Sequence, residues 1–218
     1  MPTASQVSAA PSMSSRALRR AAWISGVAFL LLALPVRLGL LTPLDASALL
    51  WVHGFDTDAR TRVMYVISDI GAGAVAIPIA VAVLIYLRWR RRLPEARWYL
   101  LATLVGWGMN VVLKFLVDRP RPKLFRHRGQ GGWDGFPSGH TMMAVLVFGL
   151  GAWLVTRDIR EGGLRVLVLG LTVALILAIG VSRIYLGAHY PGDVVGALLA
   201  GVAWGALTGL YLRRKEEG

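Results

Sequence analysis

The sequence contains no cysteine and has few acidic residues. The missing cysteine excludes disulfide bonds, thiolate catalysis and cysteine-ligated metal sites. Only 12 residues are Asp or Glu against 24 Lys or Arg, which gives a net charge of +12. In a soluble protein this balance would raise nucleic acid as a partner. Here the cations cluster at the ends of apolar segments, so we expect no nucleic acid and favour anionic lipid and phosphate.

Charged residues are sparse overall, and apolar residues are abundant. Of the 218 residues, 17% are charged and 56% are hydrophobic, and the mean hydropathy is +0.57. A helix needs about 20 mostly apolar residues to cross a bilayer. Six stretches come close, at residues 21–41, 63–87, 98–117, 141–155, 164–181 and 194–212. We therefore predict an all-α integral membrane protein with a bundle of six transmembrane helices.

The remaining segments fit around these spans. Residues 1–15, rich in Ser, Ala and Pro, are predicted to be a disordered tail, and residues 16–218 a single domain. Arginines before the first span resemble a signal peptide, but the apolar run is too long, so we expect a retained helix. Residues 43–62 are too short to span and mix apolar with acidic side chains, which predicts an interfacial helix. Residues 129–132 are glycine-rich and predict a loop.

The distribution of basic residues predicts an orientation. With six spans, four basic groups fall on one side of the membrane. They are Arg16, Arg19 and Arg20; Arg88, Arg90, Arg91 and Arg92; Arg157, Arg160 and Arg165; and Arg213, Arg214 and Lys215. The positive-inside rule makes that side of the plasma or inner membrane cytoplasmic, with both termini inside. The basic stretch 114–128 then lies outside, so either a helix is miscounted or these cations are kept there to bind an anion.

Three short motifs carry the candidate chemistry. Lys114 ends the third apolar segment, and Arg121 follows between Pro120 and Pro122, which hold the chain extended. A lysine at a helix end and an arginine on a stiff loop can converge on one anion, since arginine presents a planar fork to phosphate oxygens. A snorkelling lysine followed by an ordinary basic loop is the simpler alternative for this motif.

The second motif is Pro137-Ser138-Gly139-His140, directly before the fourth span. Ser138 stands at the expected N-cap, and Gly139 allows close backbone approach. Free backbone N–H groups at a helix start favour phosphate binding, and His140 in the first turn can protonate a leaving oxygen. An ordinary serine cap with an incidental histidine remains the alternative.

The third motif is Ser182-Arg183 followed by His189 and Asp193. A histidine and an aspartate four residues apart at a helix start can lie close together. The carboxylate then accepts the proton of one imidazole nitrogen and leaves the other free as a nucleophile. The alternative is a Pro-Gly turn with a capping aspartate.

Taken together, K-x6-R-P, P-S-G-H and S-R-x5-H-x3-D match the complete signature of the type 2 phosphatidic acid phosphatase superfamily, which also includes the vanadium haloperoxidases. The chain resembles the bacterial membrane lipid phosphatases of this superfamily over roughly residues 20–212. Every position of the signature is present in order.

The resemblance implies a role for each residue of the signature. His189 is the nucleophile that forms a phosphohistidine, Asp193 orients it, and His140 is the general acid and then the base. The phosphate oxygens are bound by Lys114, Arg121, Ser138, Gly139 and Arg183. No metal or other cofactor is required. We expect the additional cations Arg119, Lys123, Arg126 and Arg128 to be peripheral, although a diphosphate would use some of them.

The resemblance also implies the substrate class, lipid mono- and diphosphates. A compact chain whose chemistry faces outward fits undecaprenyl diphosphate recycling first, with phosphatidylglycerophosphate or phosphatidic acid as alternatives. A lipid phosphotransferase or a non-catalytic lipid-binding protein is a further alternative, and a haloperoxidase is disfavoured because those relatives are larger and soluble. The oligomeric state is not readable from the sequence.

Overall fold

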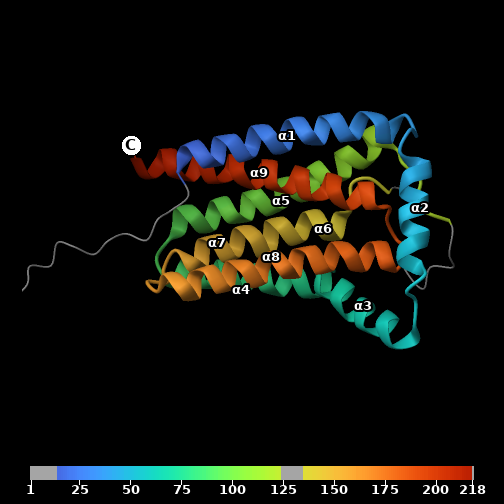
Figure 1. Cartoon of the computed structure of the whole chain (residues 1–218). Helices are drawn as coiled ribbons and strands as arrows, with labels where there is room; N and C mark the ends of the chain where they lie inside the picture. Colours follow the sequence, from blue (N-terminus) through green and yellow to red (C-terminus); the bar gives the residue numbers. More distant parts are fainter. Residues whose placement is uncertain (1–13, 124–134, 218) are drawn as a thin grey trace, which may run out of the picture.

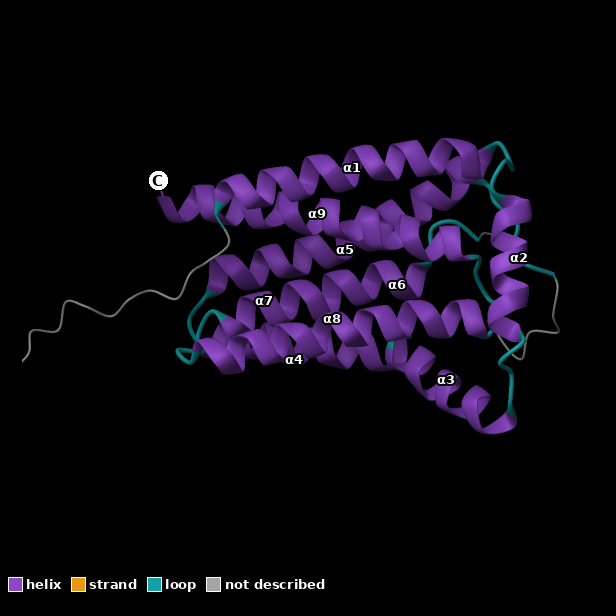
Figure 2. Ribbon diagram, viewed as in Figure 1, coloured by secondary structure: helices purple, strands orange, loops and turns teal. Residues whose placement is uncertain are grey.

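The computed structural model describes residues 14–123 and 135–217 (Figure 1). Within these residues the regular elements are all helices (Figure 2). They are α1 (Ser15–Arg37), α2 (Thr42–His53), α3 (Asp58–Ile70), α4 (Gly73–Trp89), α5 (Leu93–Val117), α6 (Gly139–Ala144), the π-helical η1 (Val145–Leu150), α7 (Gly151–Thr156), α8 (Gly162–Tyr185) and α9 (Pro191–Glu217). Almost all of the predicted tail, and the loop predicted at 129–132, lie outside the described residues.

The long helices run side by side and confirm the predicted membrane bundle (Figure 1). In the described part of the chain, five helical segments are long and apolar enough to cross a membrane, counting α6, η1 and α7 as one. The pair α3 and α4 makes a sixth if it is taken as one span. The chain is therefore a multi-pass, all-helical membrane protein.

The second predicted span, residues 63–87, is not one straight helix. The chain bends by 42° between α3 and α4. Ala72, between the two glycines at 71 and 73, is extended with ψ 156°, and this residue breaks the helical hydrogen-bonding pattern. Glycine pairs are common sites of such breaks. As a result α3 leans away from the bundle while α4 packs in it (Figure 1).

The predicted interfacial segment 43–62 contains one complete helix, α2, and the start of α3. Helix α2 lies across the ends of the long helices (Figure 1). Leu44, Leu50 and Trp51 are exposed, whereas Asp45 and Leu49 on the same helix are buried. Helix α2 thus turns Asp45 toward the bundle and exposes apolar side chains on its outer side.

The segment α6–η1–α7 is the most buried of the candidate spans and forms the centre of the bundle. Met142 and Leu146 pack with Phe136 and Ala197 in one apolar cluster. The wider turns of η1 change the carbonyl directions, and the Tyr99 hydroxyl donates to the Val147 carbonyl at 3.0 Å. In hydrocarbon, where water cannot supply a partner, this contact satisfies the hydroxyl of Tyr99.

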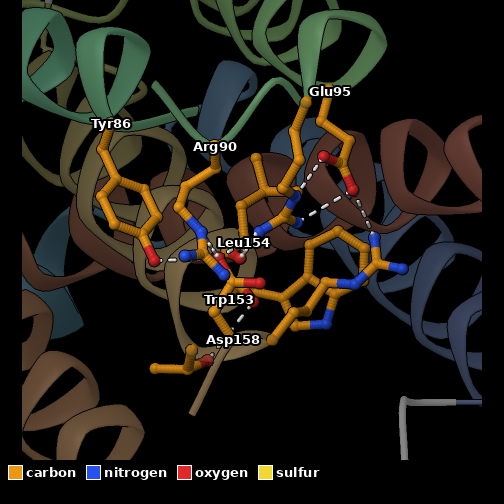
Figure 3. A network of polar contacts seen from close by, with 9 residues as sticks. Tyr86, Arg90, Glu95, Trp153, Leu154 and Asp158 are labelled. Carbon is orange, nitrogen blue, oxygen red and sulfur yellow. Dashed lines mark hydrogen bonds and ion pairs between the residues drawn. The ribbon is translucent and has the colours of Figure 1, made fainter. Parts of the chain in front are cut away.

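A polar network closes the end of the bundle where α4, α7 and the start of α5 meet (Figure 3). The Asp158 carboxylate accepts a hydrogen bond from the Tyr86 hydroxyl at 2.8 Å and pairs with Arg92 at 3.0 Å. Arg92 also pairs with Glu95 and donates to the Leu154 carbonyl at 3.0 Å. Burial works to raise the pKa of Asp158, but the Tyr86 hydrogen bond and the Arg92 charge outweigh it and hold that pKa below its usual value.

We expect Asp158→Asn to destabilise the protein, because the Tyr86 and Arg92 groups lose a charged acceptor. The loss should be about 1–2 kcal/mol at pH 7, which is about 2–8 °C in the detergent-solubilised melting temperature. A carboxyl whose pKa is lower in the folded than in the unfolded protein stabilises the fold at pH values above the unfolded pKa, so the difference should shrink as the pH falls below about 4. Glu161→Gln is the matched control, since Glu161 is exposed and makes no capping hydrogen bond. Equal melting temperatures for wild type and Asp158→Asn at pH 7 would contradict this role.

Candidate active site

The three sequence motifs come together at the end of the bundle that α2 crosses. From the first motif, Lys114 is in the last turn of α5 and Arg121 follows that helix. From the second, Ser138 and His140 begin α6. From the third, Arg183 is in the last turn of α8, His189 is in the α8–α9 turn and Asp193 is in the first turn of α9. The structure thus assembles residues that are up to 79 positions apart along the chain into one region. The polar network around Asp158 lies at the opposite end (Figure 1).

His189 and Asp193 form a buried pair. The His189 side chain is 2% exposed, and its Nδ1 lies 3.4 Å from Oδ2 of Asp193. The same oxygen accepts the backbone N–H of Tyr190 at 2.9 Å, the residue before α9, which is the reciprocal half of a capping box. Asp193 therefore caps the helix and contacts the imidazole at once, so both sequence interpretations of this residue describe real contacts.

The environment of His189 favours the neutral imidazole. Burial lowers the pKa of His189 to about 4, and the opposing effect of the Asp193 carboxylate is smaller. The charges of Arg121 and Arg183 lower the pKa further. With Nδ1 turned to the carboxylate, the lone pair available for reaction is on Nε2.

His140 lies among the same cations. Lys114, Arg121 and Arg183 are close enough to act electrostatically on its ring, as is His189. Its Nε2 atom is buried and has no hydrogen-bond partner within the described residues. Because buried polar atoms are normally paired, this nitrogen is available to a further hydrogen-bonding group.

Arg183 is held on one side only. Its Nη1 donates to the Ser68 hydroxyl of α3 at 2.5 Å, while its Nε is buried and unpaired among residues 14–123 and 135–217. A guanidinium with an unpaired buried N–H can donate a hydrogen bond to an anionic oxygen without breaking an existing contact.

Ser138 occupies the predicted N-cap position of α6, but its side chain makes no capping hydrogen bond. Its hydroxyl instead accepts from the Thr141 hydroxyl at 3.1 Å, and its backbone N–H donates to the Asp193 carbonyl at 3.0 Å. The close approach predicted at Gly139 is present, since a Cβ there would lie 3.2 Å from Oδ1 of Asn110. Asn110 in turn donates to the Pro137 carbonyl at 3.4 Å, which joins α5 to this motif.

The expectation that Arg119 is peripheral is wrong. The side chain is 4% exposed and pairs with Asp193 at 2.8 Å and with Asp45 of α2 at 2.7 Å. Its guanidinium lies 4.4 Å from the ring centre of Tyr190. In the sequence, the feature that could have indicated a buried partner for Arg119 is the Asp45 carboxylate in a largely apolar segment. Asp45 precedes Arg119 by 74 residues. Lys123 is exposed as expected, and Arg126 and Arg128 lie outside the described residues.

An apolar cavity of about 460 Å³ reaches the site between α4 and α5. Gly139 and His140 are among its lining residues, together with apolar side chains of both helices. Three of these, Ile77, Leu104 and Trp107, are more than half exposed on the outside of the bundle. The cavity therefore opens sideways, toward the hydrocarbon of a membrane.

Within the described ranges, no group of three or more His, Asp or Glu side chains is placed to hold a metal ion. Cations surround the two imidazoles instead. The fold and the site together define a multi-pass membrane protein with a buried His–Asp pair and an anion-binding cluster next to a lipid-facing cavity.

The chain belongs to the PAP2 superfamily, whose family model matches residues 95–217. It is similar to phosphatidylglycerophosphatase B of Bacillus subtilis, with 27% identity over 65% of this chain and 70% of that protein. It is also similar to the lipid A 1-phosphatase of Rhizobium johnstonii, with 30% identity over 53% of this chain. That match covers 48% of the length of the lipid A 1-phosphatase.

Solved structures share the fold. A PAP2-type phosphatidylglycerolphosphate phosphatase from Bacillus subtilis superimposes with a TM-score of 0.82 at 23% identity, covering 88% of this chain and 96% of that one. LpxE from Aquifex aeolicus gives a TM-score of 0.59 at 24% identity, covering 76% and 94%. The overall helical fold is thus one that solved structures already show.

We expect the His189 ring to stay neutral from pH 8 down to pH 5, because its pKa is lowered by burial. The measurement is a pH titration of the imidazole carbon signals by NMR, on protein labelled selectively at its four histidines. A His189→Asn variant assigns the signal, and a midpoint near the ordinary 6.5 for this ring would contradict the prediction.

Proposed function

We propose that the chain is a metal-independent PAP2 phosphatase that hydrolyses a lipid phosphomonoester or diphosphate through a phosphohistidine at His189. The observation that carries this proposal is the cavity that ends at His140 and opens sideways between α4 and α5. It provides an apolar path to a polar, cationic site, which is what a phosphate on a lipid anchor needs.

In the first step, the Nε2 lone pair of neutral His189 attacks phosphorus. The N–P bond forms as the P–O bond to the lipid breaks, and His140 gives its Nε2 proton to the departing oxygen. Asp193 stabilises the positive charge that develops on His189. The negative charge of a phosphate bound beside His140 favours the protonated imidazole, so substrate binding itself favours the acid form.

In the second step, His140 takes a proton from water, and the resulting nucleophile attacks the phosphohistidine. The N–P bond breaks, inorganic phosphate leaves, and His189 returns to its neutral form. In both steps Lys114, Arg121 and Arg183, with the Ser138 hydroxyl and the Gly139 N–H, hold the phosphoryl oxygens and stabilise the transition state. Fixed cations in a site shielded from water have a large effect of this kind.

We propose that residues 16–218 form one domain, oriented with the site on the periplasmic or extracellular side of the plasma or inner membrane. Support comes from the arginines at the opposite end of the bundle, in the α4–α5 and α7–α8 connections and at the start of α1. The positive-inside rule makes that end cytoplasmic, together with both termini.

Two substrates are tested first. Undecaprenyl diphosphate is one, since outward-facing chemistry on a compact chain fits carrier recycling. Phosphatidylglycerophosphate is the other, since the chain is similar to a protein named phosphatidylglycerophosphatase B. With either lipid, the same nucleophile, acid and cations act on the phosphate.

The test measures phosphate release by the detergent-purified protein from these two lipids and from phosphatidic acid, with and without a chelator. We expect release from at least one lipid to persist with chelator. His189→Ala should abolish it, and Asp193→Asn should slow it by about 10⁴-fold, because the imidazole then adopts the wrong tautomer.

Acid-quenched wild-type protein should carry labelled phosphate on histidine, and His189→Ala should carry none. Unchanged release by a folded His189→Ala would disprove the mechanism. Release that requires an added alcohol acceptor would instead favour a lipid phosphotransferase. No release from any lipid by the folded wild type would favour a lipid-binding protein.

The cavity makes a separate prediction. Ala80 of α4 lines it, and Ala80→Trp should fill part of the space. We expect kcat/KM for a long-chain lipid phosphate to fall by at least about tenfold, the scale of losing a few buried methylenes. The rate with a short-chain, water-soluble phosphate ester should be retained.

Ala82→Trp is the matched control, because Ala82 is on the same helix, is exposed and does not line the cavity. Equal losses for both variants, or equal losses for long and short substrates, would show that the cavity does not hold the lipid chain.

A further inference from the structure

A chain of buried charged contacts reaches His189 from outside the signature motifs. It runs from Asp45 of α2 to Arg119, on to Asp193 and then to His189. All four side chains are less than a tenth exposed. Neither Asp45 nor Arg119 has a place in the three motifs, and Asp45 lies outside the residues that match the family model.

Arg119 fixes the orientation of the Asp193 carboxylate. Oδ1 accepts from Nη1 of Arg119 at 2.8 Å, while Oδ2 accepts the Tyr190 N–H at 2.9 Å. With both oxygens held from different directions, the carboxylate plane is set. The direction in which Oδ2 meets Nδ1 of His189 is set with it, and the position of the reactive Nε2 follows.

Asp45 fixes Arg119. Its Oδ2 accepts from Nη2 of Arg119 at 2.7 Å, and its Oδ1 accepts the Gly192 N–H at 2.9 Å. A Cβ at Gly192 would lie 2.7 Å from Oδ2 of Asp45, so a side chain there would displace the carboxylate. Asp45 thus holds both the guanidinium and the first turn of the helix that carries Asp193.

The contacts among Asp45, Arg119 and Asp193 also set the net charge beside His189. A buried arginine between two carboxylates leaves one net negative charge, which a positive His189 in the transition state would neutralise. In its ground state, Asp193 shares its charge with Arg119 and so favours a protonated His189 less than an unshared carboxylate would.

We propose that Arg119 and Asp45 are positioning residues for phosphoryl transfer, which hold Asp193, and through it His189, in line with the phosphate. This inference rests on His189 acting as the nucleophile. Neither side chain is assigned a contact with the substrate.

The experiment compares Arg119→Gln, Arg119→Lys and Asp45→Asn with wild type in phosphate release from whichever lipid proves best. Arg119→Gln should lower kcat by about 100-fold, the effect of a misplaced reacting group. Its KM should change by less than about threefold, because the cations that bind phosphate are intact. Arg119→Lys should recover part of the loss, since it keeps the charge but cannot hold both carboxylates in a fixed fork.

Two readouts separate positioning from general stability. First, the acid limb of the kcat/KM profile should move up by about one pH unit in Arg119→Gln, because the unshared Asp193 charge stabilises protonated His189. The other charged groups that face the ring, Arg121, Arg183 and His140, are unchanged. Second, Asp45→Asn combined with Arg119→Gln should be no slower than Arg119→Gln alone, because both act through one contact chain.

Lys123→Gln is the matched control, since Lys123 is an exposed cation of the same connection and should keep the wild-type rate and pH profile. The inference is overturned if Arg119→Gln and Asp45→Asn keep wild-type kcat. It is also overturned if the activity of these two variants falls only as much as their fraction of folded protein falls, and the acid limb of the kcat/KM profile stays at its wild-type pH. Retained turnover in His189→Ala would instead overturn the proposed function, whatever the Arg119 variants do.

Discussion

The site depends on one shared carboxylate. Asp193 accepts the N–H of Tyr190, pairs with Arg119 and contacts His189, and it is fully buried. An isolated buried carboxylate would be costly, but each of its oxygens has a partner here, and its charge lies between a guanidinium and an imidazole. Because the same group caps α9, the helix cannot begin properly without bringing the imidazole's partner into place.

The rest of the bundle serves to keep this group dry and aligned. The central segment α6–η1–α7 is the most buried of the candidate spans, and the Tyr99 hydroxyl of α5 donates to its Val147 carbonyl. At the far end, the network around Asp158 ties α4 and the start of α5 to the end of α7. The cavity between α4 and α5 thus lies between helices that this network joins at one end.

Much of this architecture is readable from the sequence. Long apolar runs predict the spans, because hydrocarbon leaves little freedom to the backbone, and the three motifs predict which residues converge. The bend at Ala72 is not readable, since a glycine pair in an apolar run is compatible with a straight helix as well as a broken one. The missing side-chain cap at Ser138 is not readable either, because it depends on Thr141 competing for the hydroxyl.

The largest error concerns Arg119, and its cause is general. A cation in a basic loop is usually solvated, and only the three-dimensional placement of α2 turns this one inward, against two carboxylates. A local sequence pattern does not show contacts between segments 74 residues apart, such as the one between Arg119 and Asp45.

Helix α2 joins two environments that are usually considered separately. One face presents the apolar side chains of Leu44, Leu50 and Trp51 outward, and the other inserts Asp45 between Arg119 and the first turn of α9. A rigid helix transmits displacement along its whole length. A displacement of α2 would therefore move the carboxylate that holds Arg119, and with it the partner of Asp193.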